Sequence, residues 1–236
     1  MKSLILAGGL GTRISEETSD KPKPMVLIGD RPILWHIFQI YKSHNFTEFI
    51  IATGYKTEII EKYCEELQQN TTNRDETYRA LNTGLQTSTG GRIRKGLLYI
   101  DDENIFATYG DGVADVDLKA LLKFHLRHKK LATVTAVRPQ PRFGRLEIEN
   151  DSVVHFGEKV LAREGWINGG FFVLNRKVLE YITSDDEPFE FSPLERLAAD
   201  GQLAAFKHEG FWQPMDTLRE KNDLESLYRS GKAPWL

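Results

Sequence analysis

The chain has 236 residues, 40% hydrophobic and 28% charged, a composition typical of a folded protein rather than a disordered one. Lys and Arg number 31 against 34 Asp and Glu, for a net charge of -3. No overall positive field would therefore hold nucleic acid or an anionic membrane, and phosphate could be bound only by a local cluster. The single cysteine, Cys64, excludes an internal disulfide and a cysteine-based zinc site.

The first half of the chain alternates short apolar runs with helical patterns. Buried strands are predicted at 3–7, 49–53, 104–109 and 131–137. Helices are predicted from 30–32 through 41, over 57–67, from the glycines at 90–91 through 98, and over 118–128 with Asp117 as cap. Residues 68–83 show no clear period in the spacing of their apolar residues. The polar stretch 8–25 is longer than most structureless loops, which indicates a functional segment.

The second half of the chain is predicted to add antiparallel strands to these alternating strands and helices. Residues 145–149 and 153–156 flank Asn150-Asp151 as a hairpin. A strand within 166–174, a helix from 176, another from 193, a strand over 203–207 and a closing helix from Thr217 follow. We therefore expect an α/β fold with a mixed, mostly parallel sheet flanked by helices. No linker or repeat divides the chain, so we expect one domain, 1–236. The N-terminal apolar run is too short for a signal peptide and no run reaches a membrane span, so we expect a cytoplasmic protein.

Three predicted strand ends carry unusual residues, and ligands of open α/β sheets gather at such ends. After the first strand, residues 8–13 (GGLGTR) offer unobstructed backbone N–H groups and the cation Arg13, which suits a polyphosphate. A tight turn without function is the alternative for this motif alone. Lys21 and Lys23, in KPKP, lie within fifteen residues of the glycines and could neutralise phosphate charge.

Two aspartates mark the other strand ends, Asp111 in Gly110-Asp111-Gly112 and Asp216 after Pro214-Met215. If the fold brings them together, they could hold Mg²⁺, which takes oxygen ligands from one or two carboxylates and from substrate phosphates. A turn or helix cap is the alternative for each alone.

Several other chemistries are disfavoured. Arg13-Ile14 stand where a Walker A motif needs Lys-Ser/Thr, Ile14 replaces the last glycine of a dinucleotide-binding motif, and GxSxG is absent. A dehydrogenase is therefore a weak rival. The remaining candidates are interpreted as structural: His125 and His128 as surface residues, Cys64 as a small buried residue, and Trp166, Trp212 and Trp235 as packing residues.

Taken together, the motifs resemble those of the sugar-1-phosphate nucleotidylyltransferases, and within them most closely the glucose-1-phosphate cytidylyltransferases. The matching segments are LILAGGLGTRISEETSDKPKPM, GDRPILWHI, TGGRIRK, YGDGVADVDL, LATVTAV, WINGGFFVL and PLERLAADGQLAAFKHEGFWQPMDTLREK. They cover residues 3 to about 221, apart from 66–84. LAGGxGTR with KPKPM is specific for the superfamily, whereas ISEET, TGGR, YGDGVADVD and GFWQPMDTLR are specific for the cytidylyltransferase branch. The implied fold is Rossmann-like, of the nucleotide-diphospho-sugar transferase type, with a nucleotide-binding part over about 1–140 and an acceptor-binding part over about 141–236.

The resemblance also implies roles for individual residues. The nucleotide-binding residues would be Leu6, Ala7, Gly8, Gly9, Gly11, Thr12, Arg13, Lys23, Thr87, Arg92, Gly110 and Asp111. The catalytic residues would be Arg13, Lys23 and Asp111, the magnesium ligands Asp111 and Asp216, and the acceptor-binding residues Lys159, Asn168 and Gly169. Where the family has the motif Glu-Lys-Pro, this chain has Glu158-Lys159-Val160 and so departs from the motif at its last position.

The implied reaction joins CTP and a sugar 1-phosphate to give a CDP-sugar and pyrophosphate, with Mg²⁺ as cofactor, for nucleotide-sugar and polysaccharide biosynthesis. A dTTP- or UTP-dependent transferase, another phosphorylated acceptor, and a catalytically silent regulatory module remain alternatives. The chain is shorter than the family before Thr89-Gly90-Gly91-Arg92, in a region implicated in subunit contacts, and residues 68–83 are mostly polar. Because stable interfaces are richer in apolar surface, we expect a homodimer rather than the family's hexamer.

Overall fold

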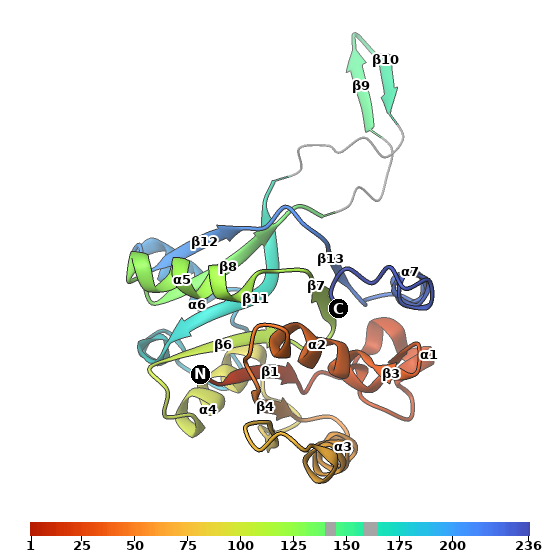
Figure 1. Ribbon diagram of the computed structural model, residues 1–236. Coiled ribbons are helices and arrows are strands. Elements are labelled where there is room, and N and C mark those ends of the chain that lie inside the picture. Colours follow the sequence, from red (N-terminus) through yellow and green to blue (C-terminus); the bar gives the residue numbers. More distant parts are fainter. Residues whose placement is uncertain (140–144, 158–164) are drawn as a thin grey trace.

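A seven-stranded sheet forms the centre of the structure, a computed structural model in which residues 1–139, 145–157 and 165–236 are described (Figure 1). Its strand order is β12 (Leu203–Lys207), β8 (Ala132–Val137), β11 (Ile167–Asn175), β6 (Asn104–Tyr109), β1 (Ser3–Ala7), β4 (Glu48–Thr53) and β5 (Thr77–Asn82). β11 runs antiparallel to both of its neighbours, and the other pairs are parallel. The prediction of a mixed, mostly parallel sheet is confirmed.

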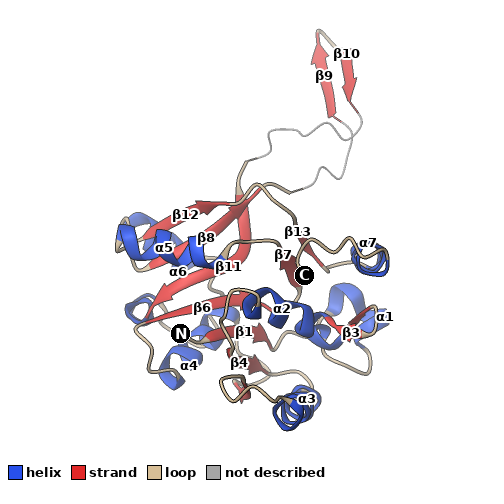
Figure 2. Cartoon of the chain, viewed as in Figure 1, coloured by secondary structure: helices blue, strands red, loops and turns tan. Residues whose placement is uncertain are grey.

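Helices cover both faces of this sheet, as Figure 2 shows. One face carries α2 (Ile33–Lys42), α3 (Thr57–Asn70), α5 (Leu118–His128) and α7 (Leu218–Arg229). The other carries α4 (Thr89–Tyr99), α6 (Ser192–Ala199) and the 3₁₀ helix Arg176–Tyr181. Successive residues of a strand therefore enter opposite cores, as Ile5 and Leu6 of β1 do. Burial on both faces explains why these strands are continuous apolar runs.

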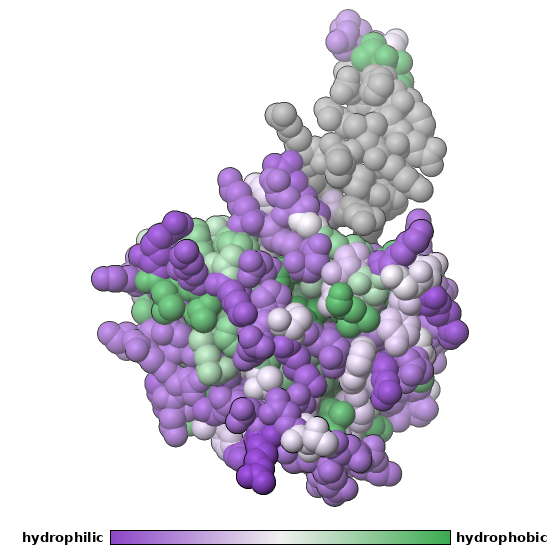
Figure 3. Space-filling model, in the orientation of Figure 1, coloured by the Kyte–Doolittle hydropathy of each residue, from purple (hydrophilic) through white to green (hydrophobic). Residues whose placement is uncertain are grey.

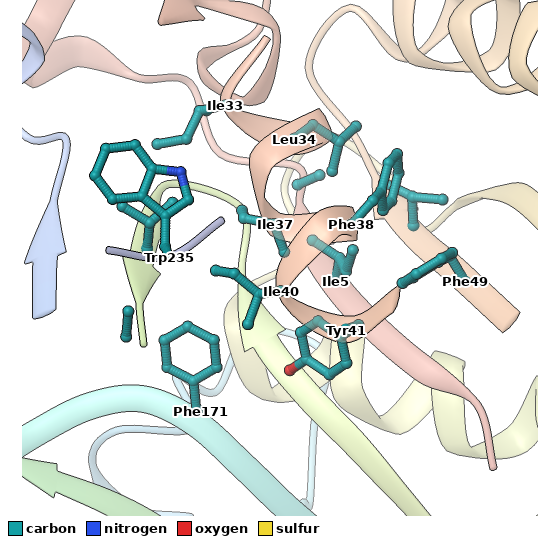
Figure 4. Close-up of a cluster of buried hydrophobic side chains, with 14 of the residues drawn as sticks. Ile5, Ile33, Leu34, Ile37, Phe38, Ile40, Tyr41, Phe49, Phe171 and Trp235 are labelled. Carbon is teal, nitrogen blue, oxygen red and sulfur yellow. The ribbon is translucent and has the colours of Figure 1, made fainter. Parts of the chain in front are cut away.

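The larger core lies between α2 and the sheet (Figure 4). Six side chains of α2 enter it, namely Ile33, Leu34, Ile37, Phe38, Ile40 and Tyr41. The rings of Phe38 and Phe49 lie 4.6 Å apart between centroids. Each such side chain contributes roughly 1.5–3 kcal/mol on burial. Trp235 closes the cluster and donates from Nε1 to Nδ1 of the buried His36 at 3.1 Å, which fastens the C-terminus to α2.

Most predicted elements occur, with shifted ends. The helix expected from 30–32 begins at Ile33, and Asp30 does not cap it but accepts a hydrogen bond from Tyr228 at 2.9 Å. The helix expected over 57–67 continues to Asn70, and α4 begins before the glycines expected to precede it. The segment 8–25 is not a plain loop, because it holds the 3₁₀ helices Thr12–Ile14 and Lys23–Met25 and the short α1 (Ser15–Thr18).

Residues 68–83, which showed no period, contain the edge strand β5. Only Tyr78 among its residues is buried, and the others are half-buried or exposed. An edge strand next to solvent needs no regular alternation of apolar residues, so its sequence gives a weak signal.

Three smaller pairs of strands complete the described fold. β9 (Arg145–Glu149) and β10 (Ser152–Gly157) form the predicted antiparallel hairpin. β2 (Leu27–Ile28) pairs with β3 (Arg31–Pro32), and β7 (Gly112–Ala114) pairs with β13 (Trp212–Pro214). Neither of the last two pairs was predicted, and the β7–β13 pair shapes the candidate active site.

Hydrophilic residues cover most of the face drawn in Figure 3. No helix in the described residues is long and apolar enough to cross a membrane.

Candidate active site

The carboxyl ends of β1, β4 and β6 lie at one edge of the sheet, because these strands are parallel. The amino end of the antiparallel β11 joins them there. From β1 the chain first builds β4 and β5 on one side and later β6 on the other, so β1 and β6 flank a topological switch point. A cavity of about 1440 Å³ opens at this edge.

Nearly all of the residues predicted for the site line this cavity. They are Leu6, Ala7, Gly8, Gly9, Gly11, Thr12, Arg13, Lys23, Thr87, Arg92, Gly110, Asp111, Asn168, Gly169 and Asp216. Lys159 lies outside the described residues. Lys21 is not among the lining residues, so of the two lysines in KPKP only Lys23 is directed to the cavity.

The glycine loop after β1 is held in shape by its own neighbours. Gly11 has φ +69°, and a Cβ there would lie 2.9 Å from the Thr18 side chain. The Thr18 hydroxyl donates to the Gly11 carbonyl at 3.0 Å. A left-handed conformation and a close approach therefore both require glycine at position 11.

Lys23 occupies the centre of the site. Its ammonium donates to Oδ2 of Asp111 at 2.7 Å and to Oδ1 of Asp216 at 2.6 Å, and its side chain is only 9% exposed. Arg13, by contrast, is 70% exposed and donates to Oδ2 of Asp216 at 2.6 Å. The two aspartates thus meet at one cation although they come from distant parts of the chain.

The β7–β13 pair brings these aspartates together. Gly112 pairs with Pro214, and the Met215 N–H donates to the Asp111 carbonyl at 2.8 Å. Thr217, not Asp216, caps α7, in a capping box with Glu220. The alternative interpretation of Asp216 as a helix cap is therefore wrong, and its carboxylate faces the cations instead.

These groups fit a magnesium ion that is shared with a substrate. Both aspartates direct a carboxylate oxygen at one point, where the Lys23 ammonium now lies. The described residues include no cluster of three or more His, Cys, Asp or Glu suited to a metal. At phosphate-transfer sites Mg²⁺ is usually bound by one or two carboxylates, and phosphate oxygens complete its coordination shell.

Arg92 contributes to the lining of the cavity, but its guanidinium is buried against the glycine loop. It is 4% exposed, and its guanidinium donates to the carbonyls of Thr53 at 2.7 Å and Gly8 at 3.0 Å and to the Thr83 hydroxyl. A Cβ at Gly8 would lie 2.0 Å from this guanidinium, so a side chain there would push Arg92 away from its buried acceptors. Burial lowers the pKa of Arg92. In this structure Arg92 joins the ends of β1, β4 and β5.

The glycines of the TGGR segment have a packing role. A Cβ at Gly90 would lie 2.3 Å from the Glu187 carbonyl, and one at Gly91 would lie 2.3 Å from the Asp185 carbonyl. They let α4 approach the segment before α6 closely. Thr87 lines the cavity, and its hydroxyl donates to the Thr83 carbonyl at 2.6 Å.

Asn168 and Gly169 reach the cavity from β11. The register of β11 against β8 shifts between Asn168 and Phe172, which is typical of a bulge. A Cβ at Gly169 would lie 2.9 Å from the Thr135 carbonyl, and the Gly169 carbonyl accepts from Trp212 Nε1 at 2.7 Å. The glycines in WINGG therefore allow a local break in the strand beside the site.

Tyr109, Glu190 and Trp212 are among the lining residues that sequence reasoning missed. Trp212 was interpreted as a packing residue, and its position after a predicted strand end was the available signal. Tyr109 immediately precedes Gly110-Asp111, so its place at the same strand end could have indicated it. Glu190 carried no local signal, because it lies in an irregular segment before α6.

The prediction that His125 is a surface residue is wrong. His125 is 3% exposed, and its Nδ1 lies 2.9 Å from the Thr133 hydroxyl. His128 is half-buried and contacts the same hydroxyl at 2.8 Å. Burial lowers the pKa of His125 to about 4. The interpretation of Cys64 as a buried residue is confirmed, and burial raises its pKa to about 12.

With this fold and site in place, comparisons with known proteins identify the class. The family model described as nucleotidyl transferase matches residues 2–218, and the chain belongs to that family. It is 48% identical over 253 aligned residues to the glucose-1-phosphate cytidylyltransferase of Salmonella typhi, covering 100% of this chain and 98% of that protein. It is 41% identical to the "Probable glucose-1-phosphate cytidylyltransferase" of Bacillus subtilis (strain 168), covering 100% and 99%.

Among solved structures, HddC from Yersinia pseudotuberculosis superposes with a TM-score of 0.73 at 24% identity, covering 96% of this chain and 99% of that one. This likeness supports the fold. The protein is therefore a nucleotidyltransferase with the architecture expected of sugar nucleotidyltransferases.

Proposed function

We propose that this protein is a cytidylyltransferase that joins CTP to a sugar 1-phosphate such as glucose 1-phosphate, giving a CDP-sugar and pyrophosphate. The observation that carries the proposal is the meeting of Lys23, Asp111 and Asp216 in one cavity beside the glycine loop. Identity of 48% to a glucose-1-phosphate cytidylyltransferase along the whole chain supports the choice of substrates.

The glycine loop and the two cations before α2 would bind the triphosphate. Gly8, Gly9 and Gly11 leave backbone groups of the loop accessible to phosphate oxygens. Arg13, on the exposed side, and Lys23, at the buried centre, would offset charge that develops towards pyrophosphate. Arg92 holds the loop from below.

Asp111 and Asp216 would hold Mg²⁺, with CTP oxygens as its other ligands. When bound, the ion would supply charge neutralisation at the triphosphate. An ion held there would take the carboxylate oxygens that Lys23 now contacts, so the ammonium would become available to the nucleotide phosphates.

The acceptor needs no protein base. Its phosphate oxygen is already anionic, attacks the α-phosphorus, and forms the new P–O bond as the bond to pyrophosphate breaks. The chain contributes placement and charge neutralisation. By this assignment Asn168 and Gly169 lie on the acceptor side of the cavity, and in the sheet order β6 separates their strand from the strand before the glycine loop. Lys159 would join them.

A preference for CTP would be set by hydrogen-bond complementarity. CTP donates from its exocyclic amine where UTP and dTTP present an acceptor, so a site built for one rejects the other. Thr87 is a candidate because it lines the same cavity as the glycine loop. Transfer of another nucleotide, or to another phosphorylated acceptor, is the alternative within the family.

Pyrophosphate release tests the proposal. The protein is assayed with CTP, UTP, dTTP, GTP and ATP, each against glucose 1-phosphate and other sugar 1-phosphates. We expect the highest kcat/KM with CTP, loss of turnover in EDTA, and recovery with Mg²⁺. Equal kcat/KM for CTP, UTP and dTTP would contradict the assigned nucleotide. No release with any pair would favour a catalytically silent binding module.

Asp111→Ala and Asp216→Ala test the metal ligands. Each should lower turnover by at least about 10² while the circular dichroism spectrum stays that of the parent. Asp115→Ala is the matched control, because Asp115 contacts His208 at 3.0 Å and is not a lining residue. Unchanged turnover in either of the first two variants would remove that aspartate from the site.

A further inference from the structure

A chain of hydrogen bonds crosses the cavity wall from β11 to α4. Asn168 Nδ2 donates to the Tyr109 hydroxyl at 3.1 Å, which donates to Oε1 of Glu190 at 2.6 Å. Oε2 of Glu190 accepts from the Thr89 hydroxyl at 2.5 Å. Four residues from four separate segments are thus connected through one carboxylate.

The direction of every bond in this chain is fixed. The Gly170 N–H donates to Asn168 Oδ1 at 2.8 Å, so the Asn168 amide nitrogen must be the group that faces Tyr109. Tyr109 then accepts from Asn168 and gives its own proton to Glu190. Thr89 accepts from the Phe189 N–H at 2.9 Å, so its proton goes to Glu190 as well. Glu190 is therefore an acceptor at both oxygens.

This arrangement leaves one N–H of Asn168 without an acceptor among the described residues. The side chain lines the cavity, so the remaining N–H is available to a ligand. Its direction depends on Tyr109, which has little freedom of its own. Gly170, at φ +80°, packs so closely that a Cβ would lie 2.5 Å from the Tyr109 ring.

Tyr109 is held between Asn168 and Glu190, because its hydroxyl accepts from Asn168 at 3.1 Å and donates to Glu190 at 2.6 Å. The ring therefore has a fixed place at the end of β6.

We propose that Glu190 is a positioning residue for the acceptor: through Tyr109 it fixes the amide of Asn168, whose remaining N–H then donates to an oxygen of the sugar phosphate. This inference rests on the proposed function and adds a residue to it. Glu190 also holds Thr89, which lies in the TSTGGR segment on the nucleotide side. The Glu190 carboxylate therefore connects the nucleotide side and the acceptor side of the cavity, although it was predicted as a binding residue for neither.

Two conservative variants test the role. Tyr109→Phe removes only the hydroxyl between Asn168 and Glu190. Glu190→Gln replaces the charged acceptor by a neutral amide, which weakens the hydrogen bond from Tyr109 even where the amide oxygen still faces its hydroxyl. We expect KM for glucose 1-phosphate to rise about tenfold to a hundredfold in each, because hydrogen bonds to a charged group are of that strength. KM for CTP should stay within about twofold in Tyr109→Phe, which leaves the contact between Glu190 and Thr89 intact.

Glu195→Gln is the matched control. Glu195 lies on α6, five residues after Glu190, where it is exposed and does not line the cavity. The substitution removes the same charge as Glu190→Gln but leaves the chain of hydrogen bonds intact. It should therefore leave both Michaelis constants unchanged.

The outcomes separate this inference from the proposed function. A parent protein that releases no pyrophosphate from CTP and glucose 1-phosphate would overturn both. If the parent is active, a rise in KM for the sugar phosphate alone supports the positioning role. No change, or an equal change in both Michaelis constants, would overturn it, since a merely structural role would affect both substrates. Calorimetric titration of each variant with glucose 1-phosphate and with CTP measures the same split without turnover.

Discussion

The Lys23 ammonium lies 2.6 Å from Oδ1 of Asp216 while it also contacts Asp111 at 2.7 Å. A cation of the protein thus occupies the point at which two carboxylates converge. Without it, two negative charges would face each other in a partly buried site, which is unfavourable. Lys23 therefore stabilises the metal-free site, and it must compete with any divalent cation for the same oxygens.

Replacing Lys23 should separate its two roles. In Lys23→Met the two carboxylates lose the ammonium that they share, so we expect the nucleotide-free protein to bind Mn²⁺ more tightly than the parent. Turnover should nevertheless fall by about 10² to 10³, because a preorganised charge beside the phosphates is lost. Calorimetric titration with Mn²⁺ and a pyrophosphate assay measure the two effects.

Lys21→Met provides the control for this prediction, since Lys21 is two residues away and does not line the cavity. It should change neither quantity. Weaker or unchanged Mn²⁺ binding in Lys23→Met would show that the ammonium does not compete with the ion.

The centre of the sheet was predictable because β1, β4 and β6 are buried on both faces and each is followed by a glycine. β1 and β6 were recognised from five or six consecutive residues each. The β7–β13 pair was not, because each strand has only three residues and the pairing joins distant parts of the chain. The meeting of Asp111 and Asp216 depends on that pair, so the sequence alone could suggest it only through chemistry and resemblance.

The errors have a common physical cause. His125 lies on a helix rich in charge, but the residues that bury it belong to other elements, among them Thr133 and Asn104. Glu190 is similar, because its partners come from β6 and α4. Long-range contacts of single polar side chains leave no periodic trace in the sequence.

Arg92 should be irreplaceable by lysine. Its guanidinium reaches acceptors on Gly8, Thr53 and Thr83 at once, whereas a single ammonium cannot match this planar geometry. We expect Arg92→Lys to lower the free energy of unfolding by about 2–3 kcal/mol, because buried acceptors lose their partners. We also expect KM for CTP to rise, since the glycine loop loses its support. Urea denaturation and steady-state kinetics check the two effects.

Arg94→Lys is the control on the same helix, because Arg94 is 42% exposed and its ion pair with Asp185 is long, at 3.4 Å. This substitution should lower the free energy of unfolding by less than about 0.5 kcal/mol. Equal losses in both variants would contradict the anchoring role of Arg92.

The assembly in solution should be a dimer. The apolar side chains of the shortened region are already used inside the protein, since Tyr78 and Ala80 pack in one core and Leu81 packs in the other. The remaining residues there offer little apolar surface to a partner, and two-fold dimers are the commonest closed assembly. Light scattering at micromolar concentration should give about twice the 27.0 kDa of one chain. A stable hexamer would contradict this expectation.

Acid should destabilise the protein through His125. Burial lowers its folded-state pKa to about 4, against an ordinary value of 6.5. The folded protein therefore favours the neutral ring. Its contribution to the free energy of unfolding is complete above pH 6.5 and is lost as the pH falls towards 4. Between pH 7.5 and 5.0 we expect a loss of about 2 kcal/mol from this group. Urea denaturation at both pH values, for the parent and for His125→Gln, isolates it from other titrating groups. The variant should have a lower free energy of unfolding than the parent at pH 7.5, but this free energy should fall less on acidification. Equal falls in the two proteins would show that His125 is not the responsible group.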